Sequence, residues 1–191
     1  IHRAKTQVKP TDAIIYEMSV RDFSMQKEAG FSQPGKFNSL TESPEIDGHY
    51  FGLQYLQDLG VTHVQLMPLY DFGSVDEKHP ELVYNWGYDP VQYNVPDGSF
   101  ATNPHDPYNR IFELQQAIET YHQADISVIM DVVYNHVYDA DSYAFEKIVP
   151  GYFYRLDAIG FRTNGTFCGN DVASEKAMVR RYIKQSVKPW V

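Results

Sequence analysis

The stretch SVIMDVVYNH, residues 127–136, decides the expected fold of this chain. It begins as a short apolar run rich in β-branched side chains, which is typical of a strand buried on both faces of a parallel sheet. Asp131 interrupts the run, and Tyr134, Asn135 and His136 follow where the strand must end. Ligands bind at the carboxyl ends of parallel strands. The stretch therefore predicts a ligand-binding strand end, although Asp131 alone also fits a satisfied buried acid and His136 an ordinary capping residue.

The remainder of the chain alternates strands with helices around this stretch. In chain order, we expect strands at residues 13–18, 61–69 and 127–133, helices at 50–59 and 109–123, and a last helix that opens at Ser174. Ile14, Ile15 and Tyr16 are expected to be the buried part of the first strand. Asn109 is the expected N-cap of the second helix, Gly60 should terminate the first, and Pro189 should bend or end the last.

Long irregular segments follow each predicted strand, at residues 24–45, 70–106 and 134–173, whereas the links from helix to strand are short. This α/β pattern predicts a parallel sheet. Long loops after the strands are typical of the TIM (β/α)8 barrel, whose active sites lie in those loops. We therefore expect residues 13–191 to form the first three β/α units of an incomplete barrel, after an incoming linker at 1–12. A doubly wound sheet is the alternative, but no Gly-rich phosphate loop follows any of the strands.

Composition restricts the classes of partner. The net charge is −9, with 16 basic and 25 acidic side chains, so we expect no nucleic-acid or membrane partner. A single cysteine, Cys168, cannot form an internal disulfide, and no apolar run approaches the roughly 18 residues that span a bilayer. These features predict a soluble protein, cytoplasmic or secreted. Aromatic residues make up 15% of the chain, and we expect some of them to face a ligand.

The second long loop contains the motif YNWGYDP, residues 84–90. Three large rings around a glycine and a proline can form a stiff aromatic wall. Such a wall packs well against the C–H face of a sugar, whose hydroxyl groups need polar partners such as Asn85 and Asp89. The alternative is an aromatic loop that packs onto the fold as part of its core.

These motifs resemble those of a known family. YNWGYDP resembles the signature of type I pullulanases, which belong to the α-amylase superfamily (glycoside hydrolase family 13), and DVVYNH at residues 131–136 resembles the first conserved region of that superfamily. AIIYEMSVRDF, residues 13–23, is similar to the first barrel strand of these enzymes. CGNDVASEKAMVRRYI, residues 168–183, is similar to the segment that leads to their fourth strand. The resemblance covers nearly the whole chain and implies the amino-terminal part of the catalytic barrel.

The resemblance implies roles for individual residues. Tyr88 should stack under the glucose in subsite −1, and Asp89 should help to fix the orientation of the Tyr88 ring. His136 should hydrogen-bond the 6-hydroxyl of the same glucose. Asp131 should support the active-site arginine. The remaining residues expected to contact substrate are Trp86, Asn135, Asn170 and Asp171, of which the last two should line the leaving-group side.

No cofactor or metal is expected. The counterpart of Asn135 binds calcium in amylases, but the surrounding loop does not present a cluster of oxygen ligands.

The catalytic residues of the family are not expected within this chain. A retaining glycosidase needs two carboxyl groups about 5 to 5.5 Å apart, and the resemblance implies a nucleophilic Asp after strand four, an acid Glu after strand five and a further Asp after strand seven. We therefore expect part of a debranching enzyme that hydrolyses α-1,6-glucosidic bonds with retention in pullulan, amylopectin or glycogen, inactive without the remainder of the barrel. The alternatives are a non-catalytic α-glucan-binding fragment, an α-amylase or isoamylase-type relative, and a plain α/β domain.

Overall fold

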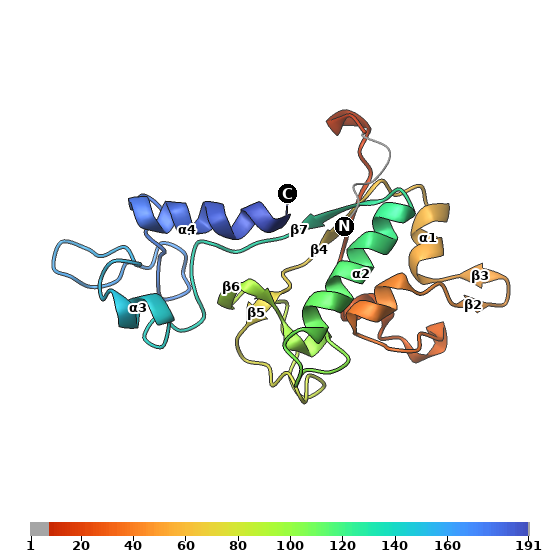
Figure 1. The fold of residues 1–191 in the computed structure, drawn as a ribbon, viewed down its shortest axis with the longest axis horizontal. Helices are drawn as coiled ribbons and strands as arrows, with labels where there is room; N and C mark the ends of the chain where they lie inside the picture. Colours follow the sequence, from red (N-terminus) through yellow and green to blue (C-terminus); the bar gives the residue numbers. More distant parts are fainter. Residues whose placement is uncertain (1–7, 191) are drawn as a thin grey trace. The chain divides into compact units, whose positions relative to one another are not determined.

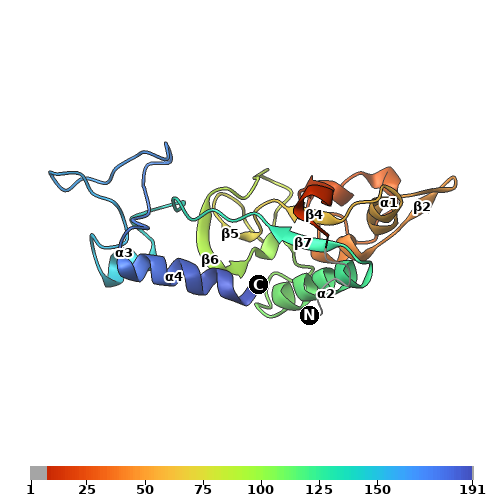
Figure 2. The same cartoon turned by 90° about the horizontal axis from the view of Figure 1, so that it is seen from above.

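The computed structural model describes residues 8–190 of the chain (Figures 1 and 2). The chain forms two compact units. Unit 1 comprises the described part of Ile1–Leu69 together with Ser74–Trp86 and Pro96–Val132, and unit 2 comprises Tyr70–Gly73, Gly87–Val95 and the described part of Val133–Val191. Residues 1–7 of the expected linker lie outside the described residues, and the rest of it contains a 3-10 helix, η1 (Pro10–Asp12).

A parallel three-stranded sheet forms the centre of unit 1. Its strands are β1 (Ile15–Met18), β4 (His63–Leu66) and β7 (Ser127–Met130), in the order β1-β4-β7. Tyr16 is in register with Val64, and Val64 with Val128. All three strands fall within the predicted segments but are shorter than predicted. The α/β class and the parallel sheet are therefore confirmed.

The predicted burial of the outer strands is wrong. Every residue of β7 is only half-buried, Ile14 and Ile15 are 54% and 53% exposed, and Tyr16 is half-buried. Both β1 and β7 are edges of the described sheet, so each has one neighbouring strand and one open side. The central strand matches the prediction better, because Val64 and Leu66 are buried.

Two helices of unit 1 occur where their apolar spacing predicts them. Helix α1 (Gly52–Asp58) ends just before Gly60, whose φ of 77° is the left-handed conformation expected after a helix. Helix α2 (Asn109–Gln123) lies beside β7 (Figure 1) and buries Leu114, Ile118 and Tyr121. The N-cap prediction is wrong, because Tyr108 occupies that position. Asn109 is the first helical residue, and its Oδ1 accepts a hydrogen bond from the Asn103 N–H at 2.9 Å.

The segments predicted as irregular loops contain short elements. The first segment contains η2 (Asp22–Ser24), η3 (Lys27–Ala29), η4 (Phe37–Thr41) and β2 (Glu45–Ile46), and β2 pairs with β3 (His49–Tyr50). The second segment contains β5 (Tyr70–Phe72), β6 (Pro90–Pro96) and η5 (Gly98–Phe100). The third segment contains α3 (Ala144–Ile148). Glycine and proline mark turns correctly, but short strands fit between those turns. Phe37 and Leu40 of η4 are fully buried and pack with α2 in the core of unit 1.

Unit 2 combines the two-stranded sheet β5-β6 with α3 and α4 (Ala177–Val187). Helix α4 begins three residues later than predicted, because the Lys176 N–H closes a turn onto the Ala173 carbonyl before the helical bonds start. It ends at Val187, before Pro189 in η6 (Lys188–Trp190), as predicted.

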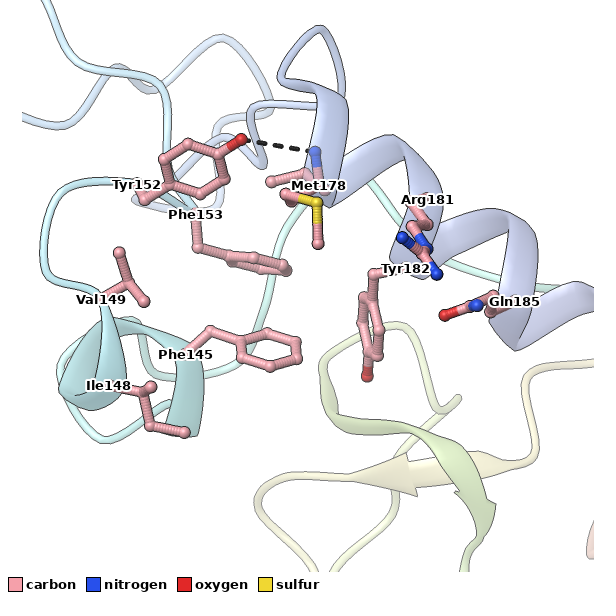
Figure 3. Close-up of a pocket in the computed structure, with 10 residues that line it drawn as sticks. Phe145, Ile148, Val149, Tyr152, Phe153, Met178, Arg181, Tyr182 and Gln185 are labelled. Atoms are coloured by element: carbon pink, nitrogen blue, oxygen red, sulfur yellow. Dashed lines mark hydrogen bonds between the residues drawn. The ribbon is translucent and has the colours of Figure 1, made fainter.

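Aromatic side chains form the core of unit 2. The rings of Tyr143 and Phe153 lie 4.9 Å apart, and those of Phe145 and Tyr182 meet edge to face at 4.8 Å. A mostly apolar cavity of about 700 Å³ opens between α3 and α4, where Phe145, Phe153 and Tyr182 line it (Figure 3). Much of the aromatic content of the sequence is therefore core.

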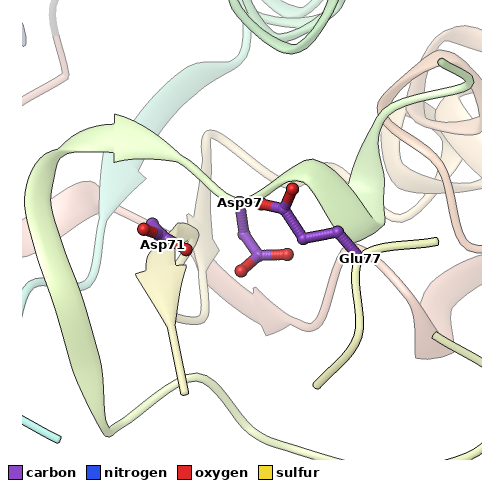
Figure 4. Close-up of side chains that lie close together, drawn as sticks. All are labelled: Asp71, Glu77 and Asp97. Carbon is purple, nitrogen blue, oxygen red and sulfur yellow. The ribbon is translucent and has the colours of Figure 1, made fainter. Parts of the chain in front are cut away.

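An ion pair connects two loops of unit 1 to α2. Two N–H groups of Arg110 donate to the carboxylate of Glu77 at 2.7 Å each, and Arg110 is only 8% exposed. Glu77 also accepts the Gly98 N–H at 2.8 Å, while the adjacent Asp97 caps η5 by accepting the N–H and the hydroxyl of Ser99. Figure 4 shows the Glu77 and Asp97 side chains on their loops.

None of the helices in the described part of the chain combines the length and apolar character needed to cross a membrane.

Candidate functional site

The aromatic motif at residues 84–90 is not core. Tyr84, Trp86 and Tyr88 are 49%, 62% and 37% exposed, respectively. Gly87 takes a φ of 90°, a conformation that L side chains rarely adopt, and so turns the chain directly before Tyr88. Within unit 2, the Asp89 carbonyl accepts the Gly73 N–H at 2.9 Å, which anchors the loop to the end of β5. Within unit 2, Tyr88 therefore presents part of its ring to solvent from an anchored backbone.

His136 connects this loop to the segment after β7. It is 7% exposed, hydrogen-bonds the main chain of Tyr88, and has the charge of Asp89 nearby. Its Nδ1 lies 2.9 Å from the Asn135 side-chain oxygen. Burial lowers the pKa of His136 below 6.5, against the opposing effects of the Tyr88 hydrogen bond and the Asp89 charge. The His136 imidazole is therefore neutral at pH 7. Unit 2 brings four of the predicted residues together: Tyr88, Asp89, Asn135 and His136.

Tyr93 is a positioning residue that the sequence did not reveal. Its ring is fully buried, and its hydroxyl donates to the main-chain carbonyl of His136 at 2.7 Å. The ring also packs edge to face against Tyr134, with centroids 4.9 Å apart. Tyr93 thereby fixes the backbone that carries His136. It lies on β6 within a segment predicted as loop, so no pattern in the sequence indicated this contact.

Asn170 uses its amide to join two chain segments of unit 2. Its Oδ1 accepts the Val137 N–H at 3.0 Å, and its Nδ2 donates to the Val137 carbonyl at 2.8 Å. The side chain is buried and reproduces a strand-like pair of hydrogen bonds beside His136. Asn170 therefore fixes the backbone beside His136. The role on the leaving-group side that the resemblance implies for Asn170 stays a prediction.

Asp171 is enclosed by its own loop. Its carboxylate accepts the Thr163 hydroxyl at 2.6 Å and the N–H groups of Gly165 and Thr166 at 2.8 Å each. Burial raises the pKa of this carboxyl, but the hydrogen bonds outweigh that effect and lower the pKa to about 2. The observed contacts of Asp171 thus order residues 163–171.

We predict a specific pH dependence for Asp171→Asn. Because the pKa of the folded state, about 2, lies below the ordinary value of 3.8, the ionised carboxylate stabilises the fold above about pH 4. This contribution disappears as the pH falls through 2. The variant should be less stable than the wild type by about 2 kcal/mol at pH 7, and the gap should narrow towards pH 2. Urea unfolding at pH 7, 4 and 2.5 measures this, and parallel stability curves would contradict it.

Two predicted site residues, Trp86 and Asp131, belong to unit 1. The Asp131 side chain is half-buried, and its main-chain N–H donates to the Leu66 carbonyl at 3.0 Å, which extends the β4–β7 ladder. Near Trp86 in the sequence, the Tyr84 hydroxyl donates to the Asp22 carboxylate, and the Arg21 guanidinium lies 5.1 Å from the centre of the Tyr84 ring. The first residue of the motif is therefore held by the segment after β1.

The assembled groups suit a neutral polyol. A partly exposed ring, Tyr88, stands next to a neutral imidazole and a carboxylate, so an apolar face and hydrogen-bonding groups occur together. This combination fits a sugar, which has a C–H face and hydroxyl groups at its edge. In parallel β/α folds, ligands bind in the loops that follow the strands, and Asn135 and His136 lie in such a loop.

Comparison with known proteins identifies the family. Residues 27–150 match the model of the alpha-amylase catalytic domain. The chain therefore belongs to the alpha-amylase family.

Particular relatives are pullulanases. The chain is 50% identical over 184 residues to the pullulanase of Bacillus subtilis, covering 95% of this chain and 26% of the relative. It is 34% identical over 226 residues to pullulanase 1 of Arabidopsis thaliana, covering 95% of this chain and 22% of the relative. The crystal structure of the Anoxybacillus sp. LM18-11 pullulanase complexed with maltotetraose matches with a TM-score of 0.94 and 50% identity, over 100% of this chain and 28% of that one. The chain thus spans about a quarter of the length of these relatives.

Proposed function

We propose that this chain is part of a pullulanase-type debranching enzyme that hydrolyses α-1,6-glucosidic bonds in α-glucans with retention. The observation that carries the proposal is the 50% identity to the Bacillus subtilis pullulanase across 95% of the chain. The exposed Tyr88 ring beside the buried, neutral His136 supports it independently, because these are the groups that sugar binding requires. Maltotetraose in a related pullulanase supports an α-glucan as the ligand class.

In this proposal the chain supplies the first three β/α units of a (β/α)8 barrel and part of subsite −1. Tyr88 stacks under the glucose, Asp89 helps to fix the Tyr88 ring, and His136 hydrogen-bonds the glucose 6-hydroxyl. Trp86 and Asn135 add contacts, and Asp131 supports an arginine of a later strand. The bond-breaking carboxylic acids come from other barrel strands. Asn170 and Asp171 line the leaving-group side, and their hydrogen bonds also order the loop beside His136.

The proposal is tested by hydrolysis of pullulan. Incubation of the full protein that carries this sequence should release reducing ends and produce maltotriose, with the new ends first formed as α-anomers by proton NMR, because a retaining mechanism preserves the configuration. Amylose, which has only α-1,4 bonds, is the control substrate. Cleavage of amylose in preference to pullulan would favour the amylase-type alternative. Binding of pullulan without any release of reducing ends would favour the glucan-binding alternative.

A further inference from the structure

The segment after β1 holds the start of the YNWGYDP motif through side-chain contacts within unit 1. The Tyr84 hydroxyl donates a hydrogen bond to one carboxylate oxygen of Asp22. Arg21 donates to the other oxygen at 2.8 Å, and its guanidinium lies 5.1 Å from the centre of the Tyr84 ring. Tyr84 is therefore held at its hydroxyl by an acceptor and over its face by a cation.

Tyr84 in turn holds Trp86, two residues further along the motif. The side chains of Tyr84 and Trp86 are joined by a hydrogen bond. The only polar group of a tryptophan side chain is the indole N–H, which cannot accept, so the Tyr84 oxygen is the acceptor. The hydrogen bond to Asp22 raises the pKa of Tyr84 above 10. The hydroxyl therefore stays protonated in neutral solution, donating to Asp22 while it accepts from Trp86.

Asp22 itself lies on an anchored element. It opens η2, whose last residue, Ser24, is buried. The Ser24 hydroxyl lies 2.7 Å from the hydroxyl of the buried Ser39 in η4, and it accepts the Gly35 N–H at 2.8 Å. Since η4 packs with α2, contacts lead from the core of unit 1 through η2 to Trp86. Both partners of each contact belong to this chain, so no later barrel strand is needed to make it.

We propose that Asp22 is a positioning residue for substrate binding: its carboxylate fixes Tyr84, and Tyr84 fixes the Trp86 ring that contacts the glucan. The inference rests on the proposed function, which makes Trp86 a substrate contact. A ring that is ordered before the sugar arrives loses less conformational entropy on binding. Neither Asp22 nor Tyr84 has to touch the sugar to produce this effect.

Steady-state kinetics of the full protein on pullulan test the inference. Asp22→Ala and Tyr84→Phe should each raise KM about threefold to tenfold, because each breaks a hydrogen bond that orients Trp86. The value of kcat should change little, since Trp86 adds binding contacts and takes no part in bond breaking. The double variant should be no worse than the weaker single variant, because both substitutions remove the same contact. In a Trp86→Ala background, Asp22→Ala should have no further effect.

Two further variants separate positioning from a general loss of structure. Asp22→Asn keeps a side-chain oxygen that can accept the Tyr84 hydroxyl, so its KM should lie closer to the wild type than that of Asp22→Ala. Asp58→Ala is the matched control, because Asp58 is an exposed carboxylate of unit 1 that also accepts a side-chain hydrogen bond, from the Gln54 amide at 2.8 Å. It should leave KM unchanged.

Other outcomes overturn the inference and separate it from the proposed function. If Asp22→Ala lowers the melting temperature and leaves KM at the wild-type value, Asp22 is only structural. If the effects of Asp22→Ala and Trp86→Ala multiply, Asp22 does not act through Trp86. If Trp86→Ala cleaves pullulan as the wild type does, the inference fails while the proposed function stands. If the wild type does not cleave pullulan, both proposals fail.

Discussion

Replacing Glu77 with alanine is expected to lower the free energy of unfolding by about 3–5 kcal/mol, the usual cost of removing one partner of a buried ion pair. The Arg110 side chain is only 10% exposed and donates twice to the Glu77 carboxylate, which is 29% exposed. The variant removes this carboxylate and leaves the buried positive charge with the carbonyl oxygens of Pro96 and Pro104 as acceptors. It also removes the acceptor of the Gly98 N–H. Urea denaturation at pH 7 measures the change.

A surface ion pair provides the matched control. Arg155 and Glu175 form a contact of similar length, 2.8 Å, but their side chains are 45% and 54% exposed. Because water screens this pair, Glu175→Ala should cost no more than about 1 kcal/mol. A Glu77→Ala variant that is as stable as the Glu175→Ala variant would show that Arg110 finds another partner or reaches solvent.

Removing the Tyr88 ring is expected to reduce kcat/KM on pullulan about 10- to 100-fold, with little change in melting temperature. The proposed stacking and the hydrogen bonds that depend on it together correspond to about 1.5–3 kcal/mol. Because Tyr88 is 37% exposed, its truncation to alanine leaves little void in the core. Initial rates over a range of pullulan concentrations give the ratio.

Two variants control for this effect. Tyr88→Phe keeps the stacking face and should stay within about threefold of the wild type, since it removes only a hydroxyl. Phe161→Ala removes a 69% exposed ring of unit 2 outside the motif and should leave kcat/KM unchanged. The plain α/β-domain alternative makes the opposite prediction for Tyr88→Ala, namely lower stability and no effect on any response to sugar.

Local sequence patterns predicted the main helices and strands because the spacing of apolar residues within a single element is enough to indicate its type. The spacing of Leu114, Ile118 and Tyr121 requires a helix with one buried face, and the β-branched run at residues 127–130 requires a strand. The burial of Ile14 and Ile15 was not predictable in the same way. It depends on which strands and helices lie beside β1, and a strand's own sequence does not specify its neighbours.

The residues of the candidate site also differ in whether a local sequence pattern or a distant contact determines their role. Tyr88 and His136 could be proposed from the sequence because each lies in a short motif that resembles a family signature. The roles of Asn170 and Asp171 depend on partners that loop geometry brings to them, Val137 for the first and Thr163 for the second. Tyr93 shows the same limit, since its hydroxyl reaches a carbonyl 43 residues away in the sequence.

The order of strands in the parallel sheet has a consequence for synthesis of the chain. β1, β4 and β7 lie side by side in the order in which the ribosome makes them, and 48 residues separate Ile14 from its hydrogen-bonding partner Thr62. At about 10 residues per second, that interval lasts about 5 s, whereas a helix forms in about a microsecond. Each strand of the sheet therefore leaves the ribosome seconds before its next neighbour, and the sheet can assemble in the direction of translation.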